Sequence, residues 1–247
     1  MTAPLLRSTW IRVGLRLAAL MMFGVCAFGI YINASLGVPE GIDFLTLIAA
    51  PKSDMADGGL YRPFSYVPGV EELIYETAES ALPNKNLNPP VVSALLYPLA
   101  FLDLRPAYYT LCSVQLILMV LVLWQLLRRI TSPENLPLWL ALLLTSAYFP
   151  VTANMLLGQI GLLPFITLGL FWLALENGRT RQAGAWLGLA VAMKLFVGLV
   201  FIWLVLQRRW RLLLWGALSW VALMLAGLLL FGVENHRDWL HALTRMD

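Results

Sequence analysis

The stretch AGAWLGLAVAMKLFVGLVFIWLVL, residues 183–206, decides the fold, because it is apolar throughout and carries a single formal charge. That charge is Lys194, which lies near the middle of the stretch. An ionisable side chain at membrane depth costs at least a few kcal/mol on insertion scales. A cost of that size indicates a function, such as binding the phosphate of a lipid-linked substrate. The alternative is that the ammonium group snorkels to an interface.

The composition of the whole chain is typical of a polytopic membrane protein. Of its 247 residues, 60% are hydrophobic and only 13% are charged, and the mean hydropathy is +0.76. Soluble domains average about 45–50% apolar and 25% charged residues. Cys26 and Cys112 both lie in apolar segments, so we predict no disulfide. Because no metal-ligand spacing or Gly-rich nucleotide motif occurs, we predict no metal, no cofactor and no nucleic-acid partner.

The first predicted span covers residues 11–32, about the 20 residues that a helical crossing needs. It is longer than the core of a signal peptide and no clear cleavage site follows, so we expect a retained anchor. Three basic residues at its start, Arg7, Arg12 and Arg16, predict a cytoplasmic N-terminus. The long polar loop that follows, residues 33–87, carries eight acidic and three basic side chains. That balance indicates the outer side.

Residues 88–102 are apolar but too short for a full crossing, and their prolines favour an interfacial or re-entrant helix. The remaining spans are predicted within residues 106–231. Complete crossings are predicted at residues 106–127, 136–157, 160–175 and 212–231, with a kink at Pro150. Gly158 and Gln159 then form an outer turn.

Arginines flank both ends of residues 183–206, and the positive-inside bias favours both clusters in the cytoplasm. Two half-helices that meet near Lys194 would satisfy this bias, and a single crossing is the alternative. With the half-helices, the tail at residues 232–247 lies outside. We therefore predict an all-α fold, a single membrane-embedded helical bundle over residues 1–247, with a long outer first loop and short or re-entrant helices.

Asp43 follows the first span and is flanked by apolar residues, as in Gly41-Ile42-Asp43-Phe44. A carboxylate at the membrane surface can take a proton from an attacking hydroxyl. Asp is also a common N-cap residue before an apolar turn. The sequence alone does not separate a base from a cap.

Four further polar side chains are candidates for substrate binding. Tyr61 follows a Gly-Gly turn and is either an interfacial anchor or a platform for a sugar. Asn86 and Asn88 precede Pro89-Pro90, where Asn88 is expected to cap a helix that begins at Pro89. Their amides also suit sugar hydroxyls. Gln159 lies between two apolar spans and either joins helices or contacts a ligand.

The order of these motifs resembles glycosyltransferase family 87 of the GT-C superfamily. The matching motifs, from about Ile42 to Arg211, are Asp-Phe (43–44), Gly-x-x-Tyr (58–61), Asn-x-Asn-Pro-Pro (86–90), Leu-Gly-Gln (157–159), Ala-Gly (183–184) with Lys194, and Arg-Arg-Trp-Arg (208–211). That family includes multi-pass bacterial mannosyltransferases and arabinofuranosyltransferases that use polyprenyl-phosphate sugars.

The resemblance implies sugar transfer, of mannose in particular, at the outer face of the bacterial plasma (inner) membrane. The implied partners are a polyprenyl-phosphate sugar donor, a lipid or glycan acceptor and membrane lipids. Asp43 matches the catalytic base and Lys194 the intramembrane lysine, which we expect beside the donor phosphate. If a β-linked donor gives an α-linked product, one inverting displacement suffices and needs only one base.

Two other classes of function stay open at this stage. A transporter or flippase for a lipid-linked or small polar substrate also uses charged residues within the membrane, although no internal repeat is evident. A non-catalytic membrane scaffold is the third class. Members of the family are commonly longer, with more spans, so we expect this chain to be a fragment, a truncated product or a minimal variant.

Overall fold

The computed structural model describes residues 9–35, 42–56, 59–61, 86–130 and 136–244. Within these ranges the chain forms helices and turns and no strand, which confirms the predicted all-α fold. The elements, where η denotes a 3-10 helix, are α1 (Thr9–Ser35), α2 (Ile42–Met55), α4 (Pro90–Leu96), η3 (Tyr97–Phe101), α5 (Leu104–Ile130), α6 (Leu136–Ala147), α7 (Phe149–Leu156), α8 (Leu162–Glu176), α9 (Thr180–Met193), η4 (Leu195–Gly198), α10 (Leu199–Leu206) and α11 (Trp210–Thr244).

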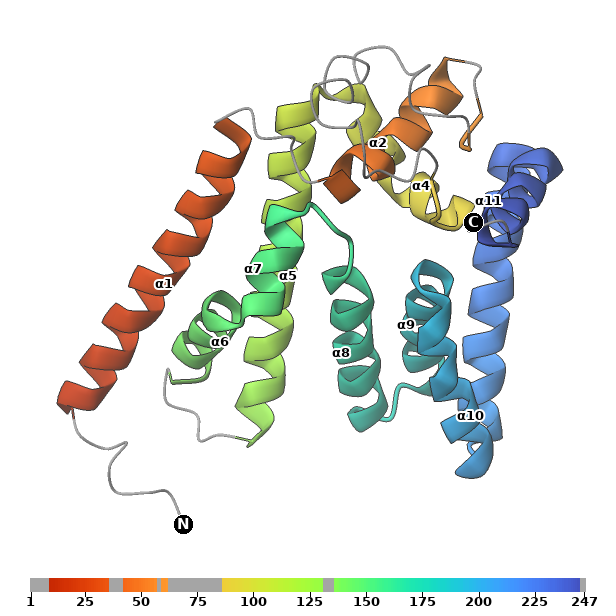
Figure 1. Ribbon diagram of the computed structural model, residues 1–247. Coiled ribbons are helices and arrows are strands. Elements are labelled where there is room, and N and C mark those ends of the chain that lie inside the picture. The colour runs from red at the N-terminus through yellow and green to blue at the C-terminus, as the bar shows by residue number, and fades with distance from the viewer. Residues whose placement is uncertain (1–8, 36–41, 57–58, 62–85, 131–135, 245–247) are drawn as a thin grey trace.

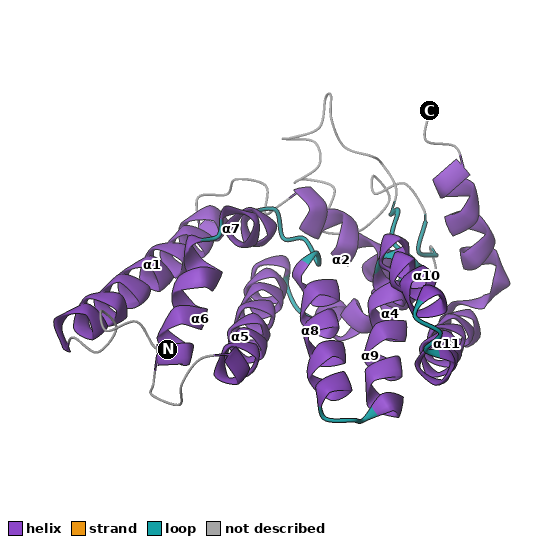
Figure 2. Cartoon of the chain, turned by 90° about the horizontal axis from the view of Figure 1, so that it is seen from below, coloured by secondary structure: helices purple, strands orange, loops and turns teal. Residues whose placement is uncertain are grey.

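The longer helices stand side by side in a row, and α2 and α4 lie on the upper side of that row (Figure 1). Along the row, α1 packs on α6, α6 on α5, α5 on α8, α8 on α9 and α9 on α11. The view from below shows the same succession from α1 to α11 (Figure 2). Most helices therefore bury one side against neighbours and present an apolar side outward, as a lipid environment requires.

Among the described residues, α5 and α11 are each long and apolar enough to cross a membrane. They contain the crossings predicted at 106–127 and 212–231. α11 has a non-helical residue at Gly232 (φ 76°, ψ 174°), directly after the predicted end of the last crossing. The pair α6 and α7 adds a third crossing if it is one span, and its two parts are bent by 63°. The bend falls at Tyr148, next to the predicted kink at Pro150, whose missing N–H interrupts the helix.

The decisive stretch forms two helices that meet at Lys194. α9 ends at Met193, Lys194 has an extended backbone (φ −142°, ψ 108°), and η4 and α10 follow. Figure 1 shows that α10 runs back toward the end of the molecule where α9 began. This is the half-helix arrangement that the two arginine clusters favoured over a single crossing.

The connections that carry the arginines lie on the side of the row opposite α2 and α4, at the bottom of Figure 1. At the last turn of α5, Arg129 donates a 2.8 Å hydrogen bond to Asn177 Oδ1 and lies 3.7 Å from the Glu176 carboxylate. At the start of α9, the Arg181 guanidinium lies 5.0 Å from the centre of the Trp215 ring. These contacts link α5 to α8 and α9 to α11 on one basic side of the row. Basic residues gathered on one side are the pattern that membrane proteins show toward the cytoplasm.

The predicted outer loop contains a helix, α2, of which the sequence indicated only a start, as the alternative that Asp43 caps a helix. Its apolar residues Phe44, Leu47 and Ile48 are spaced as on one helix face and join the main core. α2 packs on α4 and η3. Residues 62–85 of that loop, with four of its eight acidic side chains, lie outside the described residues.

Glycines allow the backbones of α9 and α11 to approach each other closely. A Cβ on Gly184 would lie 2.4 Å from Trp215 Cβ, and one on Gly188 would lie 2.5 Å from Ser219 Cβ. Ser219 Oγ also donates a 3.1 Å hydrogen bond to the Ala185 carbonyl oxygen. Small residues at such spacing let helix backbones approach in the absence of a hydrophobic driving force.

We predict that Gly188→Ala destabilises the protein, because the new methyl group would also lie 2.7 Å from the Gly216 carbonyl oxygen. Gly24→Ala in α1 is the matched control, since a Cβ added there would meet nothing within 4 Å. Alanine is a better helix former than glycine by about 0.8–1.0 kcal/mol. The control should therefore hold or raise the melting temperature in detergent, while Gly188→Ala lowers it. Equal behaviour of the two variants would contradict the close contact.

Candidate functional site

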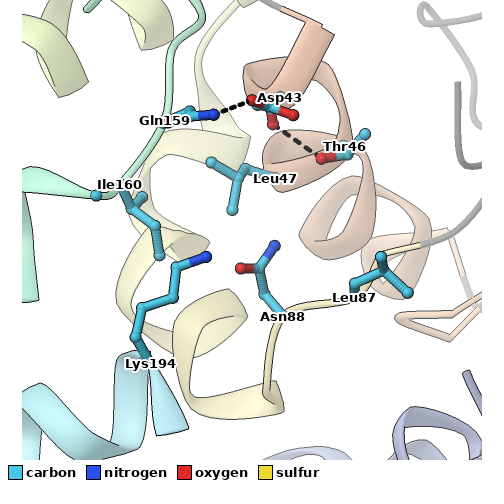
Figure 3. A pocket seen from close by; sticks show the side chains of 9 residues that line it. Asp43, Thr46, Leu47, Leu87, Asn88, Gln159, Ile160 and Lys194 are labelled. Carbon is cyan, nitrogen blue, oxygen red and sulfur yellow. Dashed lines mark hydrogen bonds between the residues drawn. The ribbon is translucent and has the colours of Figure 1, made fainter. Parts of the chain in front are cut away.

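A pocket of about 260 Å³ opens beside the start of α2, on the side of the row where α4 lies. Figure 3 shows its side chains, which come from four separate parts of the chain. Its lining consists of Asp43, Thr46, Leu47, Leu87, Asn88, Gln159, Ile160, Gly161 and Lys194. Four of the six predicted site residues thus line one pocket.

Every predicted residue in the lining stands at a helix end. Asp43 is in the first turn of α2, and Asn88 lies two residues before the start of α4. Gln159 lies in the connection between α7 and α8, and Lys194 lies between α9 and η4. Helix ends leave backbone N–H and C=O groups without partners inside the helix. The pocket is therefore a polar region where apolar helices stop.

Asp43 is held by a side chain from another helix connection. Gln159 Nε2 donates a hydrogen bond to Asp43 Oδ2, drawn as a dashed line in Figure 3. α2 begins at Ile42, so Asp43 lies inside the first turn rather than at the capping position. A negative charge in a first turn is favoured by the helix dipole, and the carboxylate still faces the pocket.

A backbone hydrogen bond joins the two segments that carry Asp43 and Gln159. The Phe44 N–H donates a 3.2 Å hydrogen bond to the Leu157 carbonyl oxygen. Between Leu157 and Gln159 stands Gly158, with φ +64°, where a Cβ would lie 2.3 Å from Phe44 Cβ. Only glycine combines this left-handed conformation with so close an approach. The Leu-Gly-Gln motif thus places its glutamine beside the aspartate.

Two buried amides, which the sequence reading missed, hold the same turn from behind. Gln115 Nε2 (3.0 Å) and Asn154 Nδ2 (2.8 Å) both donate to the Gln159 carbonyl oxygen. Gln115 is 0% exposed and Asn154 is 6% exposed. A buried amide is costly unless it is hydrogen-bonded, so polar residues within apolar spans were the available signal for this pair.

Asn88 is positioned by the two predicted residues that do not line the pocket. Asn86 Oδ1 accepts hydrogen bonds from the Asn88 N–H (2.9 Å) and from Asn88 Nδ2 (3.1 Å). The Tyr61 hydroxyl donates a 2.6 Å bond to the Asn88 carbonyl oxygen. Burial, and secondarily the charge of Asp238, raise the pKa of Tyr61 above its ordinary value, which keeps the hydroxyl protonated as a donor.

The expectation that Asn88 caps a helix beginning at Pro89 is wrong. The helix α4 begins at Pro90, its N-cap is Pro89, and no side chain makes a capping hydrogen bond. The buried Asn86 (1% exposed) instead accepts hydrogen bonds from the Asn88 N–H and from Asn88 Nδ2. These bonds tie Asn88 back to the segment that precedes it.

The end of α11 reaches back to the same segment. After the non-helical Gly232, Trp239 Nε1 donates a 3.3 Å bond to the Leu87 carbonyl oxygen. Asn235 Oδ1 accepts a 2.8 Å bond from the Leu60 N–H. These contacts fix the residues that directly precede Tyr61 and Asn88, so the tail supports one wall of the pocket.

Lys194 is partly buried and extends its side chain into the pocket from the side opposite α2 (Figure 3). Its backbone N–H closes α9 by a 3.1 Å bond to the Ala190 carbonyl oxygen. Within the described part of the chain, its ammonium group makes no ion pair, with Asp43 or any other acid. Asp43 and Lys194 are the two charged residues in the lining.

No three His, Cys, Asp or Glu side chains among the described residues gather closely enough to hold a metal ion. The lining of the pocket itself supplies a carboxylate, a separate ammonium group and side-chain amides. Such a set can accept a proton, bind an anion and hydrogen-bond to hydroxyl groups.

We predict that Gly158→Ala separates α2 from the Gln159 turn, because its methyl group would overlap Phe44. Gly178→Ala is the matched control, since Gly178 also has a positive φ (+70°) but no atom within 4 Å of an added Cβ. Both variants carry a backbone cost of about 1–2 kcal/mol. Only Gly158→Ala should speed hydrogen exchange at residues 43–47, measured by mass spectrometry. Equal exchange in both variants would show that the turn does not fasten α2.

Comparison with known proteins adds a family to this geometry. The family model for glycosyltransferase family 87 matches residues 86–247, about two-thirds of the chain. The matched region contains Asn88, Gln159 and Lys194, whereas Asp43 and Tyr61 precede it. No curated protein and no solved structure matches the chain. The chain belongs to glycosyltransferase family 87.

Proposed function

We propose that this glycosyltransferase moves a sugar, mannose in the first instance, from a polyprenyl-phosphate donor to an acceptor hydroxyl, with Asp43 as general base. The observation that carries the proposal is one pocket lined by a carboxylate, amides and an ammonium group that no described acid pairs. Family membership implies sugar transfer. The chemistry of the lining supports the rest of the proposal, as follows.

Lys194 supports a phosphate-bearing donor. A lysine between apolar helix halves is costly unless its charge meets an anion, and no described acid pairs with it. A sugar phosphate on a lipid brings such an anion to membrane depth. The ammonium group would also stabilise the negative charge that builds on the phosphate as the sugar leaves.

Asp43 supports a single inverting displacement. The acceptor oxygen attacks the anomeric carbon while the bond from that carbon to the phosphate oxygen breaks. The phosphate leaves with the electron pair, and the acceptor proton passes to the Asp43 carboxylate. One base suffices for this step, and Asp43 is the acid that lines the pocket.

Asn88 is the amide that we assign to the sugar. Its side chain lines the pocket, and its backbone is held by Tyr61 and its amide by Asn86. Tyr61 and Asn86 then influence the sugar through Asn88 rather than by direct contact. An amide held in place makes hydrogen bonds to hydroxyls at a smaller entropic cost.

The position of the pocket supports transfer at the outer face of the plasma membrane. The arginine-bearing side of the row suits the cytoplasmic side of the membrane. The pocket lies beside the start of α2, and α2 lies on the opposite side of the row (Figure 1). With this orientation the acceptor is a lipid or glycan outside the cytoplasm, where lipid-linked sugars are available and nucleotide sugars are not.

We expect membranes that contain the active protein to transfer sugar from mannosyl-phosphoryl-polyprenol and not from a nucleotide sugar. The two radiolabelled donors would be supplied separately to membranes depleted of polyprenyl phosphate, so that one cannot be converted into the other. Membranes that carry Asp43→Asn are the control for background transfer. Transfer from the nucleotide sugar alone would refute the lipid donor.

Asp43→Asn and Lys194→Met should affect turnover and donor affinity in different ways. Asp43→Asn keeps the shape of the side chain but removes the base, so turnover should fall about 10²–10⁴-fold with little change in donor affinity. Lys194→Met should weaken donor affinity as well as turnover, because the phosphate is charged before and after transfer. Single-turnover rates and equilibrium donor binding in nanodiscs measure both effects.

Lys52→Met is the matched control for charge removal. Lys52 is also partly buried, but its Nζ donates to the carbonyl oxygens of Ala100 (3.0 Å) and Leu102 (3.1 Å), and it does not line the pocket. Donor affinity should be unchanged in this variant. If Lys194→Met bound donor as tightly as Lys52→Met did, Lys194 would be a structural lysine.

A further inference from the structure

We infer that Gln159 is a positioning residue that acts through Asp43, and not a ligand of the sugar. Its side-chain amide orients the carboxylate for proton transfer. This inference rests on the proposed function, in which Asp43 is the base.

The amide nitrogen of the Gln159 side chain is already bonded to the base. A glutamine amide offers two N–H donors on Nε2 and one acceptor oxygen. Nε2 donates to Asp43 Oδ2, which leaves Oδ1 without a hydrogen-bond donor among the described residues. The terminal torsion of an aspartate is broad when it is free. One held oxygen therefore fixes the direction of the other, which remains available to accept a proton.

The place of Gln159 does not depend on a ligand. Its carbonyl oxygen receives the two buried amides of Gln115 and Asn154, and its own N–H donates 2.9 Å to the Asn154 carbonyl oxygen. The Phe44 backbone is bonded to the same turn. The start of α2, which carries Asp43, and the turn that carries Gln159 are thus joined by hydrogen bonds. Asn88 reaches the pocket from a separate segment.

A neutral donor suits this role better than a cation would. A lysine or arginine at position 159 would form an ion pair with Asp43 and weaken it as a base. An amide orients the carboxylate without a formal charge. Lys194 is the other charged group in the lining, and it makes no ion pair with Asp43, so the two charges stay available for different parts of the substrate.

The first test is a double-mutant cycle in nanodiscs with radiolabelled mannosyl-phosphoryl-polyprenol, and with acceptor supplied by membranes of source cells that lack their own copy. Gln159→Met keeps the length of the side chain and removes the donor. We expect its single-turnover rate to fall roughly 10–100-fold, as for a misplaced catalytic group, with donor binding within about twofold of wild type. Added to Asp43→Asn, it should cause no further loss, since it acts through that residue.

Asn88→Leu is the matched control, because Asn88 is the residue assigned to the sugar. It should weaken donor binding, and its effect should multiply with that of Asp43→Asn. If Gln159→Met behaved in this way, Gln159 would be a sugar ligand and the inference would be overturned. A wild-type protein without transfer from the lipid donor would instead refute the proposed function.

The second test uses Gln159→Glu, which has nearly the same shape and keeps the inference testable if Gln159→Met does not fold. A second carboxylate beside Asp43 makes it harder for both groups to lose their protons. The acidic limb of the pH–rate profile should therefore move to higher pH, while donor binding at high pH stays near that of wild type. An unmoved acidic limb would separate Gln159 from the base.

Discussion

Backbone polar groups in an apolar environment must be paired or must face a polar cavity, and this constraint shapes the whole molecule. Each helix end around the pocket leaves such groups free, and the structure satisfies many of them with side chains from elsewhere in the chain. The Gln159 carbonyl oxygen takes two buried amides, and the Asn88 carbonyl oxygen takes the Tyr61 hydroxyl. The helix breaks that line the pocket are therefore held by side-chain hydrogen bonds.

The row of helices provides the rigidity on which this arrangement depends. Gly184 and Gly188 let α9 pack closely against α11. This packing fixes α9, the helix that directly precedes Lys194. Gly158 brings α2 against the turn after α7, which fixes Asp43 from the other side. Glycine serves opposite purposes at these sites, close packing inside a helix in one case and a left-handed turn in the other.

Sequence reasoning predicts features that depend on nearby residues, and it misses contacts between distant ones. The break at Lys194 follows from one charge and two flanking arginine clusters, all within a short stretch. The bond between Asp43 and Gln159 spans 116 positions, and no local pattern encodes it. Asn88 is an exception, because its actual partner, Asn86, is only two residues away. α2 is anticipated only as the alternative that Asp43 caps a helix, because its short apolar run lies within an otherwise acidic loop.

Two opposite charges that share one pocket without pairing with each other are the feature that most needs a physical reason. A carboxylate and an ammonium group free to meet would pair, and each would then be lost to chemistry. Here each charge is anchored to a different rigid unit, Asp43 to the Gln159 turn and Lys194 to the end of α9. The packing of the helices therefore keeps the two charges apart. In the proposed reaction, the donor phosphate meets Lys194 and the acceptor hydroxyl gives its proton to Asp43, so each charge has its own partner on the substrates.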